Sequence, residues 1–200
     1  MRSLKPSSIL DLGTGFGKWG VLFREYTDII ASEHEPSRYG RENWRVRIDG
    51  VEGYTEYITP VHKYVYNELF QGDIRDVLPG LGKYDIVFLG DVIEHFEKAD
   101  GVDLLLECTR HASTAVVVST PATFVAQGAA CSNDLEIHRS HWTERDFEGF
   151  GGKAAVVEND LLVACLPSPG VESPPISSMR PSPRGPLSLL KQIARRVVGA

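Results

Sequence analysis

Four acidic residues stand at or near the ends of short apolar stretches in the first half of the chain: Asp11, Glu52, Asp73 and Asp91. If those stretches are parallel strands, their carboxyl ends lie along one edge of a sheet, which is where such sheets bind ligands. Carboxylates gathered at one edge attract a cation and repel phosphate groups. The sequence therefore predicts a site for a cationic ligand at that edge.

A glycine-rich turn directly follows the first of these acids. Residues 13–17 read Gly-Thr-Gly-Phe-Gly, and an apolar pattern typical of a helix begins at Trp19. Glycine lets the backbone bend tightly and come close to a ligand, because it carries no Cβ. A strand, a glycine turn and a helix in this order are the opening of a doubly wound α/β domain.

The same turn permits a second interpretation. Residues 15–20 match the dinucleotide-binding pattern G-x-G-x-x-G, and Glu33 lies 18 residues past Gly15, about where a ribose-binding acid would stand. A pyrophosphate is a poor fit to Asp11 and the three later acids, and residues 27–33 hold only a brief apolar run. An NAD(P)-dependent oxidoreductase therefore stays as the alternative.

Seven stretches of the chain have the length and composition of strands. They are residues 8–12, 46–52, 69–72, 84–89, 115–119, 153–158 and 161–166, the last two forming a hairpin around Asn159-Asp160. Helical patterns alternate with the first five. The sequence predicts an α/β fold with a doubly wound, mostly parallel seven-stranded sheet and a C-terminal β-hairpin. We expect one domain over 1–166, followed by a Pro/Ser-rich linker and a short basic tail over 167–200.

Three helices can be placed by their ends or by their apolar residues. Thr59 and Pro60 predict the start of one helix, and its expected apolar face is Val61, Tyr64 and Val65. A second helix over about 99–111 has Val102, Leu105, Leu106 and Thr109 on its expected apolar side. A capping box from Thr143 to Asp146 predicts a third, short helix.

The net charge of −6 at pH 7 averages two unlike parts of the chain. Residues 167–200 carry five basic residues and one acid, so residues 1–166 carry −10. The acidic body disfavours a nucleic-acid partner. Residues 187–198 have apolar side chains at helical spacing and basic ones elsewhere, so this tail could lie on an anionic membrane surface; a disordered or self-packed end is the alternative.

The apolar stretches and the cysteines bear on the cellular compartment. No stretch approaches the roughly 18 apolar residues of a transmembrane helix, and the first apolar run meets Asp11 too early for a signal peptide. The three cysteines, Cys108, Cys131 and Cys165, are far apart and odd in number, which suits reduced thiols. We therefore expect a cytoplasmic protein.

Several segments together resemble one enzyme family. Residues 9–17, Ile-Leu-Asp-Leu-Gly-Thr-Gly-Phe-Gly, are similar to the first motif of class I S-adenosylmethionine-dependent methyltransferases. Residues 50–52 and 72–74 resemble the second and third motifs. Residues 89–96 resemble the segment after the fourth strand in the small-molecule branch that includes the ubiquinone-biosynthesis enzymes, as do 119–121 and 141–147. The resemblance covers about residues 7–166.

The resemblance implies a cofactor, S-adenosylmethionine, and roles for the acids. Asp11 and the glycine turn would face the methionine part, Glu52 rather than Glu33 would accept from both ribose hydroxyls, and Asp73 would accept from the adenine amino group. Asp91 would lie near the sulfonium. The implied cofactor-binding residues are Asp11, Gly13, Thr14, Gly15, Gly17, Glu52, Asp73, Ile74 and Asp91.

Two histidines are candidates for catalysis. His95 is four residues past Asp91, on the same face if that segment is helical, and a histidine titrates near neutral pH, which suits a general base. The alternative is that His95 only caps or packs a helix start. His141 is the second candidate, in or beside the segment 121–142, which could cover the acceptor, as could 31–46. His138 and His141 could bind a metal, but no third ligand is evident, so none is expected.

These inferences favour one function and leave two alternatives. We expect a methyltransferase that transfers a methyl group from S-adenosylmethionine to a small-molecule, lipid-linked or glycan-type acceptor. The alternatives are the NAD(P)-dependent oxidoreductase and a non-catalytic protein that binds S-adenosylmethionine and acts through partners.

Overall fold

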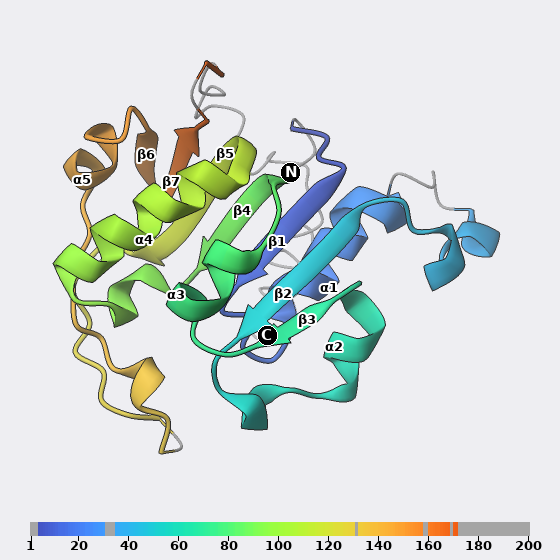
Figure 1. Ribbon diagram of the computed structural model, residues 1–200, viewed down its shortest axis with the longest axis horizontal. Coiled ribbons are helices and arrows are strands. Elements are labelled where there is room, and N and C mark those ends of the chain that lie inside the picture. The colour runs from blue at the N-terminus through green and yellow to red at the C-terminus, as the bar shows by residue number, and fades with distance from the viewer. Residues whose placement is uncertain (1–3, 31–34, 131, 158–159, 169, 172–200) are drawn as a thin grey trace, which may run out of the picture.

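One mixed sheet organises the molecule. The computed structural model describes residues 4–30, 35–130, 132–157, 160–168 and 170–171. The strands are β1 (Ser8–Leu12), β2 (Arg47–Glu52), β3 (Leu69–Gln71), β4 (Tyr84–Gly90), β5 (Ala112–Pro121), β6 (Lys153–Val157) and β7 (Leu161–Pro167). Their order in the sheet is β3-β2-β1-β4-β5-β7-β6 (Figure 1). The first five are parallel, and β7 pairs antiparallel with both β5 and β6. The predicted fold class is confirmed.

The strands at the centre of the sheet are continuous apolar runs. In β1 and β4 the residues Ile9, Leu10, Ile86, Val87 and Leu89 are all fully buried. Such runs form strands that are covered on both faces, because helices cross over each face of a parallel sheet. The fifth strand is longer than the predicted 115–119, since β7 pairs with it from 115 to 121.

Helices cover both faces of the sheet. The α-helices are α1 (Lys18–Arg24), α2 (Pro60–Val65), α3 (Ile74–Val77), α4 (Lys98–His111) and α5 (Glu144–Glu148), and the π-helix η1 (Glu25–Ile29) continues α1. Short 3-10 helices are η3 (Pro36–Arg38), η4 (Arg41–Asn43), η5 (Thr55–Tyr57), η6 (Leu78–Gly80), η7 (Ile93–His95) and η8 (Asp134–Glu136). The helices α3 and α4 lie on one face and α1 on the other (Figure 1).

The expected apolar face of the helix after Thr59 is wrong, although its start is confirmed. Thr59 caps α2 and Pro60 is its first residue. Val61 and Tyr64, however, are 41% and 55% exposed, and the buried residues are His62 and Val65. The helix is turned toward His62 because that side chain is hydrogen-bonded to the helix cap and to the glycine turn.

The expected face of the helix at 99–111 is also shifted. Leu106 is 42% exposed, and α4 buries Gly101, Leu104, Leu105 and Cys108. Gly101 packs closely on Trp142, since a Cβ there would lie 2.6 Å from the Trp142 ring. A search for large apolar side chains at helical spacing does not find this buried face, because two of its members are a glycine and a cysteine.

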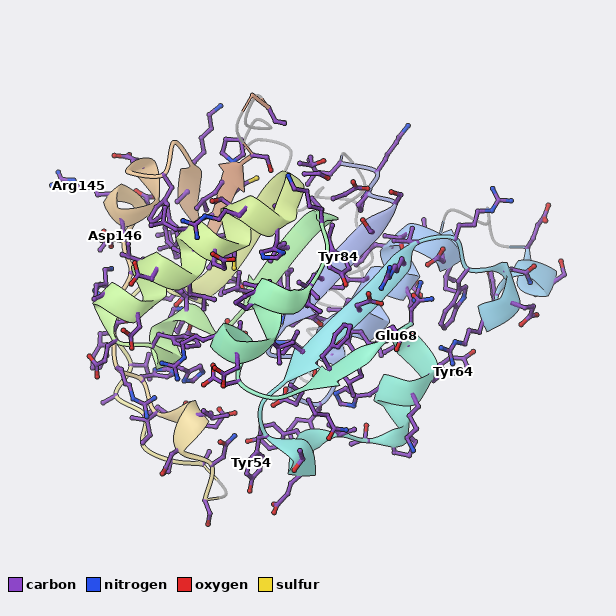
Figure 2. All side chains as sticks on the ribbon, in the orientation of Figure 1. Tyr54, Tyr64, Glu68, Tyr84, Arg145 and Asp146 are labelled. Atoms are coloured by element: carbon purple, nitrogen blue, oxygen red, sulfur yellow. The ribbon has the colours of Figure 1, made fainter. Side chains whose placement is uncertain are left out.

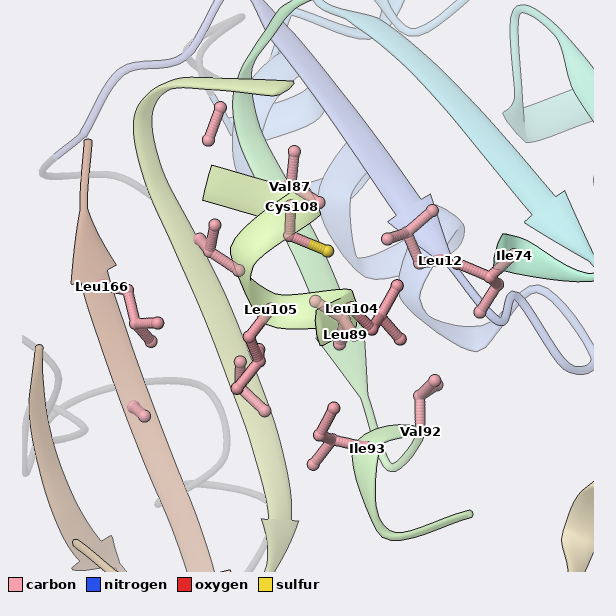
Figure 3. Close-up of a cluster of buried hydrophobic side chains, with 14 of the residues drawn as sticks. Leu12, Ile74, Val87, Leu89, Val92, Ile93, Leu104, Leu105, Cys108 and Leu166 are labelled. Atoms are coloured by element: carbon pink, nitrogen blue, oxygen red, sulfur yellow. The ribbon is translucent and has the colours of Figure 1, made fainter. Parts of the chain in front are cut away.

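The core fixes the carboxyl ends of the central strands. Figure 3 shows Leu12, Leu89 and Ile93 in one cluster with Leu104 and Leu105 of α4. These contacts anchor the segments that follow β1 and β4. The hairpin and the capping box at Thr143 are confirmed, while the tail at 187–198 lies outside the described residues. Within the described ranges, no helix combines the length and apolar character needed to cross a membrane.

Candidate functional site

A cavity of about 480 Å³ opens at the carboxyl ends of the parallel strands. Its wall includes residues that follow β1, β2, β3 and β4, such as Gly13, Glu52, Asp73 and Asp91. Figure 2 shows Tyr54 at this end of β2, with Tyr84 and Glu68 toward the opposite end of the sheet. The edge that the acidic residues predicted is therefore where the cavity lies.

Three of the four acids line the cavity, and Asp11 does not. Asp11 is fully buried below the turn, and its Oδ2 accepts a hydrogen bond of 2.5 Å from the Tyr66 hydroxyl. Its Oδ1 has no hydrogen-bond partner among the described residues. Burial raises the pKa of Asp11 to about 7, against the opposing effect of the Tyr66 bond. The Tyr66 hydroxyl thus holds the Asp11 carboxylate in the packed layer, and the expected contact of Asp11 with the cofactor stays a prediction.

The glycine turn has the backbone that its composition predicts. Gly13, Gly15 and Gly17 have φ values of 76°, 53° and 85°, in the left-handed region that disfavours other residues. A Cβ at Gly13 would also lie 2.5 Å from Val92 Cγ2. Gly13, Thr14 and Gly15 line the cavity, whereas Gly17 does not and caps the start of α1.

Glu52 connects the end of β2 to the glycine turn. Its Oε2 accepts from the Gly15 amide at 2.7 Å and from the Thr14 hydroxyl at 3.2 Å, and its Oε1 accepts from the Tyr54 amide at 2.8 Å. Burial raises the pKa of Glu52, and the bonds from Tyr54 and Gly15 oppose that rise. A carboxylate has about four acceptor positions, so Glu52 can accept further bonds from a ligand in the cavity. Glu33 lies outside the described residues.

Asp73 and Ile74 lie together at the start of α3. Asp73 caps this helix by accepting from the Arg75 amide at 2.8 Å. The Arg75 guanidinium also donates to both oxygens of Asp73, at 3.0 and 2.7 Å, and this holds the pKa of Asp73 below its usual value. Both Asp73 and Ile74 line the cavity, as does Arg75, which sequence reasoning missed.

Asp91 lies directly after β4 in a strained backbone conformation. Its φ is 58°, and its amide donates to the Ser119 carbonyl at 2.9 Å. Its carboxylate is 3.6 Å from the Lys18 ammonium, which also lines the cavity. Residues between Asp91 and His95 form only the 3-10 turn η7, so the helical face expected for this pair is wrong. Both side chains nevertheless line the cavity.

His62 of α2 is hydrogen-bonded to the glycine turn, and sequence reasoning missed this residue. It is fully buried, and its Nδ1 accepts from the Thr59 amide at 3.1 Å. Its Nε2 therefore carries the proton and donates to the Gly15 carbonyl at 3.0 Å. The signal that could have found it is its position three residues after the cap Thr59, where a capping box usually has Glu or Gln.

His95 is the candidate catalytic histidine that lines the cavity. Burial lowers its pKa, and the neighbouring His138 lowers it further. The two rings lie with centroids 4.9 Å apart. Glu94 is buried next to them and accepts from the Thr120 hydroxyl at 2.9 Å, and burial raises the pKa of Glu94 to about 7. The ligating atoms of Glu94, His95 and His138 all lie within 4.8 Å of one another.

His141 lies apart from the cavity-lining residues. Its Nε2 is 2.9 Å from the Ala122 carbonyl, and its own carbonyl accepts from Lys98 Nζ at 2.7 Å. His138 and His141 therefore do not point to a common site, because His138 turns toward His95. Between the end of β5 and η8 the described residues form no regular strand or helix, so the directions of their side chains could not be derived from a period.

That same segment supplies one wall of the cavity. Asn133, Leu135, Glu136 and Arg139 line it, whereas residues 35–46 do not. Arg139 donates to the carbonyls of His95 at 2.8 Å, Asp134 at 3.0 Å and Ile137 at 3.2 Å. Arg139 thus holds the segment against the turn that carries His95, and sequence reasoning missed it.

Negative charge dominates the cavity wall. Six carboxylates line it, namely Glu52, Asp73, Asp91, Glu97, Asp100 and Glu136, against the three cations Lys18, Arg75 and Arg139. Phe16 and Tyr57 add an aromatic contact at the rim, with ring centroids 4.8 Å apart. A wall of this composition favours a cationic ligand with an aromatic or apolar part.

Comparison with known proteins identifies the fold. No protein-family model matches the sequence, and no curated protein does. An O-methyltransferase family protein from Burkholderia thailandensis matches with a TM-score of 0.54 and 11% identity, over 82% of this chain and 51% of that one. The magnesium protoporphyrin IX methyltransferase of Synechocystis PCC 6803 with bound SAH has a TM-score of 0.51 and 13% identity, over 78% and 73%. The DhpI–SAH complex has a TM-score of 0.53 and 17% identity, over 81% and 77%.

These likenesses show that the fold is the Rossmann-like fold of methyltransferases, with its mostly parallel sheet and antiparallel C-terminal hairpin. The chain spans about half the length of the Burkholderia protein.

Proposed function

We propose that the protein binds S-adenosylmethionine in this cavity and transfers its methyl group to a small-molecule acceptor. The observation that carries the proposal is Glu52, which ends β2, lines the cavity and accepts from the Gly15 amide of the turn. A carboxylate so placed can accept from two ribose hydroxyls. The acidic wall suits a sulfonium ion better than a pyrophosphate.

In this proposal the other residues of the cavity contact different parts of the cofactor. The turn from Gly13 to Gly15 approaches the cofactor closely, Asp73 and Ile74 contact the adenine, and Asp91 lies near the sulfonium. Two of the solved structures with this fold contain SAH, the demethylated form of that cofactor. Methyl transfer needs chiefly the alignment of donor and acceptor and the exclusion of water.

The acceptor enters beside His95 and the wall formed by Asn133, Leu135, Glu136 and Arg139. The volume of about 480 Å³ is within the range of small-molecule sites. A free small molecule is compatible with such a cavity, and so is the end of a lipid-linked or glycan-type acceptor.

Calorimetry with two ligands tests the class of function. S-adenosylhomocysteine is expected to bind the wild-type chain with one site, and NAD is expected not to bind. The reverse result would support the oxidoreductase and overturn the proposal. Binding of S-adenosylhomocysteine with no methylated product, in a screen of cell extract with a labelled methyl donor, would instead support a non-catalytic cofactor-binding protein.

A further inference from the structure

Three metal-ligating side chains from distant parts of the sequence meet at the cavity wall. Glu94 and His95 belong to the turn η7 after β4, and His138 comes from the segment that follows η8. One ligand atom from each lies within 4.8 Å of the others. Only a small movement would bring three such atoms to about 2.1 Å from a common centre.

Backbone carbonyls orient both histidine rings. His138 Nδ1 lies 2.6 Å from the Val125 carbonyl, and His95 Nδ1 lies 3.3 Å from the Ile137 carbonyl. The Asp91 carbonyl also acts on the His95 ring. A carbonyl accepts only, so in the neutral His138 ring Nδ1 carries the proton and Nε2 keeps its lone pair. Metal-binding histidines are oriented in this way, by a backbone carbonyl on the other nitrogen.

The carboxylate of Glu94 is held by hydrogen bonds and has no ion-pair partner among the described lysines and arginines. Thr120 donates to Glu94 Oε2, and the Glu94 amide also donates to this carboxylate. A carboxylate has about four acceptor positions, so Glu94 can accept from a further partner. Glu94 is buried, and in the described part of the chain no lysine or arginine forms an ion pair with it. The carboxylates of Asp91 and Glu136 lie close enough to act on it. A bound cation would stabilise the ionised form of this buried carboxyl group.

We propose that Glu94, His95 and His138 bind a divalent transition-metal ion at the wall of the cavity. Two imidazoles and one carboxylate are a ligand set that suits manganese, iron, cobalt or zinc, whereas magnesium and calcium prefer oxygen ligands alone. Three protein ligands leave coordination positions open for water or an oxygen of another molecule. Because His95 also lines the cavity, the ion would be reachable from it.

A role for the ion in methyl transfer rests on the proposed function, whereas metal binding itself does not. An ion at this wall would hold an acceptor hydroxyl and lower its pKa, so the proton leaves to water. A lone pair of that oxygen then forms the bond to the methyl carbon. The electron pair of the broken carbon–sulfur bond stays on sulfur, which becomes a neutral thioether. In this arrangement His95 is a metal ligand and not the general base.

Titration with Co²⁺ tests the site directly, because its visible absorption depends on its ligands. The full chain, first dialysed against a chelator, is expected to bind one equivalent with a nitrogen-containing ligand set. His138→Ala is expected to weaken the affinity at least about 30-fold, since loss of even an outer partner costs 10- to 100-fold. Glu94→Gln is the second variant, and the unfolding temperature of each variant verifies that it is folded.

His111→Ala is the matched control. His111 also has Nδ1 near a carbonyl, Gly82 at 3.1 Å, and Nε2 near a carboxylate, Glu107 at 3.2 Å, but this pair is part of no three-ligand cluster among the described residues. Its loss is expected to leave the affinity unchanged. No uptake by the wild-type chain, or equal uptake by His138→Ala, would overturn the metal site. Binding of S-adenosylhomocysteine, measured separately, keeps this outcome distinct from failure of the proposed function.

Discussion

The two sides of the cavity are built by different means. One, which we call the sheet side, consists of Gly13, Thr14, Gly15, Glu52, Asp73 and Ile74 and follows directly from strand ends. The other, the loop side, consists of His95, Asn133, Leu135, Glu136 and Arg139 and depends on a segment with little regular structure. The sheet side is fixed by strand register, whereas the loop side is held by side chains bonded to backbone carbonyls.

The difference indicates which side of the cavity depends on the fold and which side can vary with the substrate. The glycine turn is bonded to Glu52 at the end of the next strand and to His62 of α2, both of which belong to regular elements. The loop side depends on single contacts, such as the bonds from Arg139 to the carbonyls of His95 and Asp134. Substrate choice is therefore expected to reside on the loop side, since it can change without disturbing the sheet.

The largest expected effect is on the sheet side, at Gly13. Gly13→Ala adds a Cβ at a φ of 76° and within 2.5 Å of Val92. We expect it to lower the free energy of unfolding by about 2–4 kcal/mol, from the left-handed backbone and the overpacking together. Urea denaturation measures this loss.

Gly15→Ala is the matched comparison for that substitution. Its φ is 53°, but no atom lies within 4 Å of the added Cβ. Only the backbone cost of about 1–2 kcal/mol is then expected. Equal losses for the two variants would mean that the contact with Val92 does not constrain the turn.

A smaller effect is expected on the loop side, at Arg139. Arg139→Ala removes hydrogen bonds to the carbonyls of His95, Asp134 and Ile137 from an exposed side chain. We expect a loss of about 1 kcal/mol in the free energy of unfolding. Hydrogen exchange should become faster over residues 133–139 and stay unchanged over 13–15, because the two sides are held separately.

Arg145→Ala, which removes an exposed arginine on α5, is the control for that experiment. It should alter exchange on neither side of the cavity. Faster exchange over both 133–139 and 13–15 in Arg139→Ala would contradict the separation of the two sides.

The sequence predicts the sheet side well because its signals are local. Apolar runs, the turn at 13–17 and the cap at Thr59 each define an element within a few residues. The positions of Glu52 and Asp73 on the cavity then follow from strand ends. The position of Asp11 cannot be derived in this way, because only the fold brings the Tyr66 hydroxyl, 55 residues away, to its carboxylate.

The loop side could not be predicted in the same way. His138, Arg139 and Glu136 stand in a stretch without a 3.6- or 2-residue period, so no pattern gives the direction of their side chains. The sequence indicates His141 as a candidate and places His138 beside it, whereas the fold turns His138 toward His95. The predicted apolar face of α4 is wrong for a related reason. The close packing of Gly101 on Trp142 determines which side of the helix is buried, and no local pattern shows that contact.

If Glu52 holds the ribose of S-adenosylmethionine, the affinity of S-adenosylhomocysteine must depend on its carboxylate, and calorimetry on the Glu52→Gln variant measures this. Gln keeps the size of the side chain but loses the charge and one acceptor oxygen, so we expect the affinity to fall about 10-fold or more. Glu68→Gln, an exposed acid near the start of β3, is the matched control and should bind as the wild type does. An unchanged affinity in a folded Glu52→Gln variant would contradict the account.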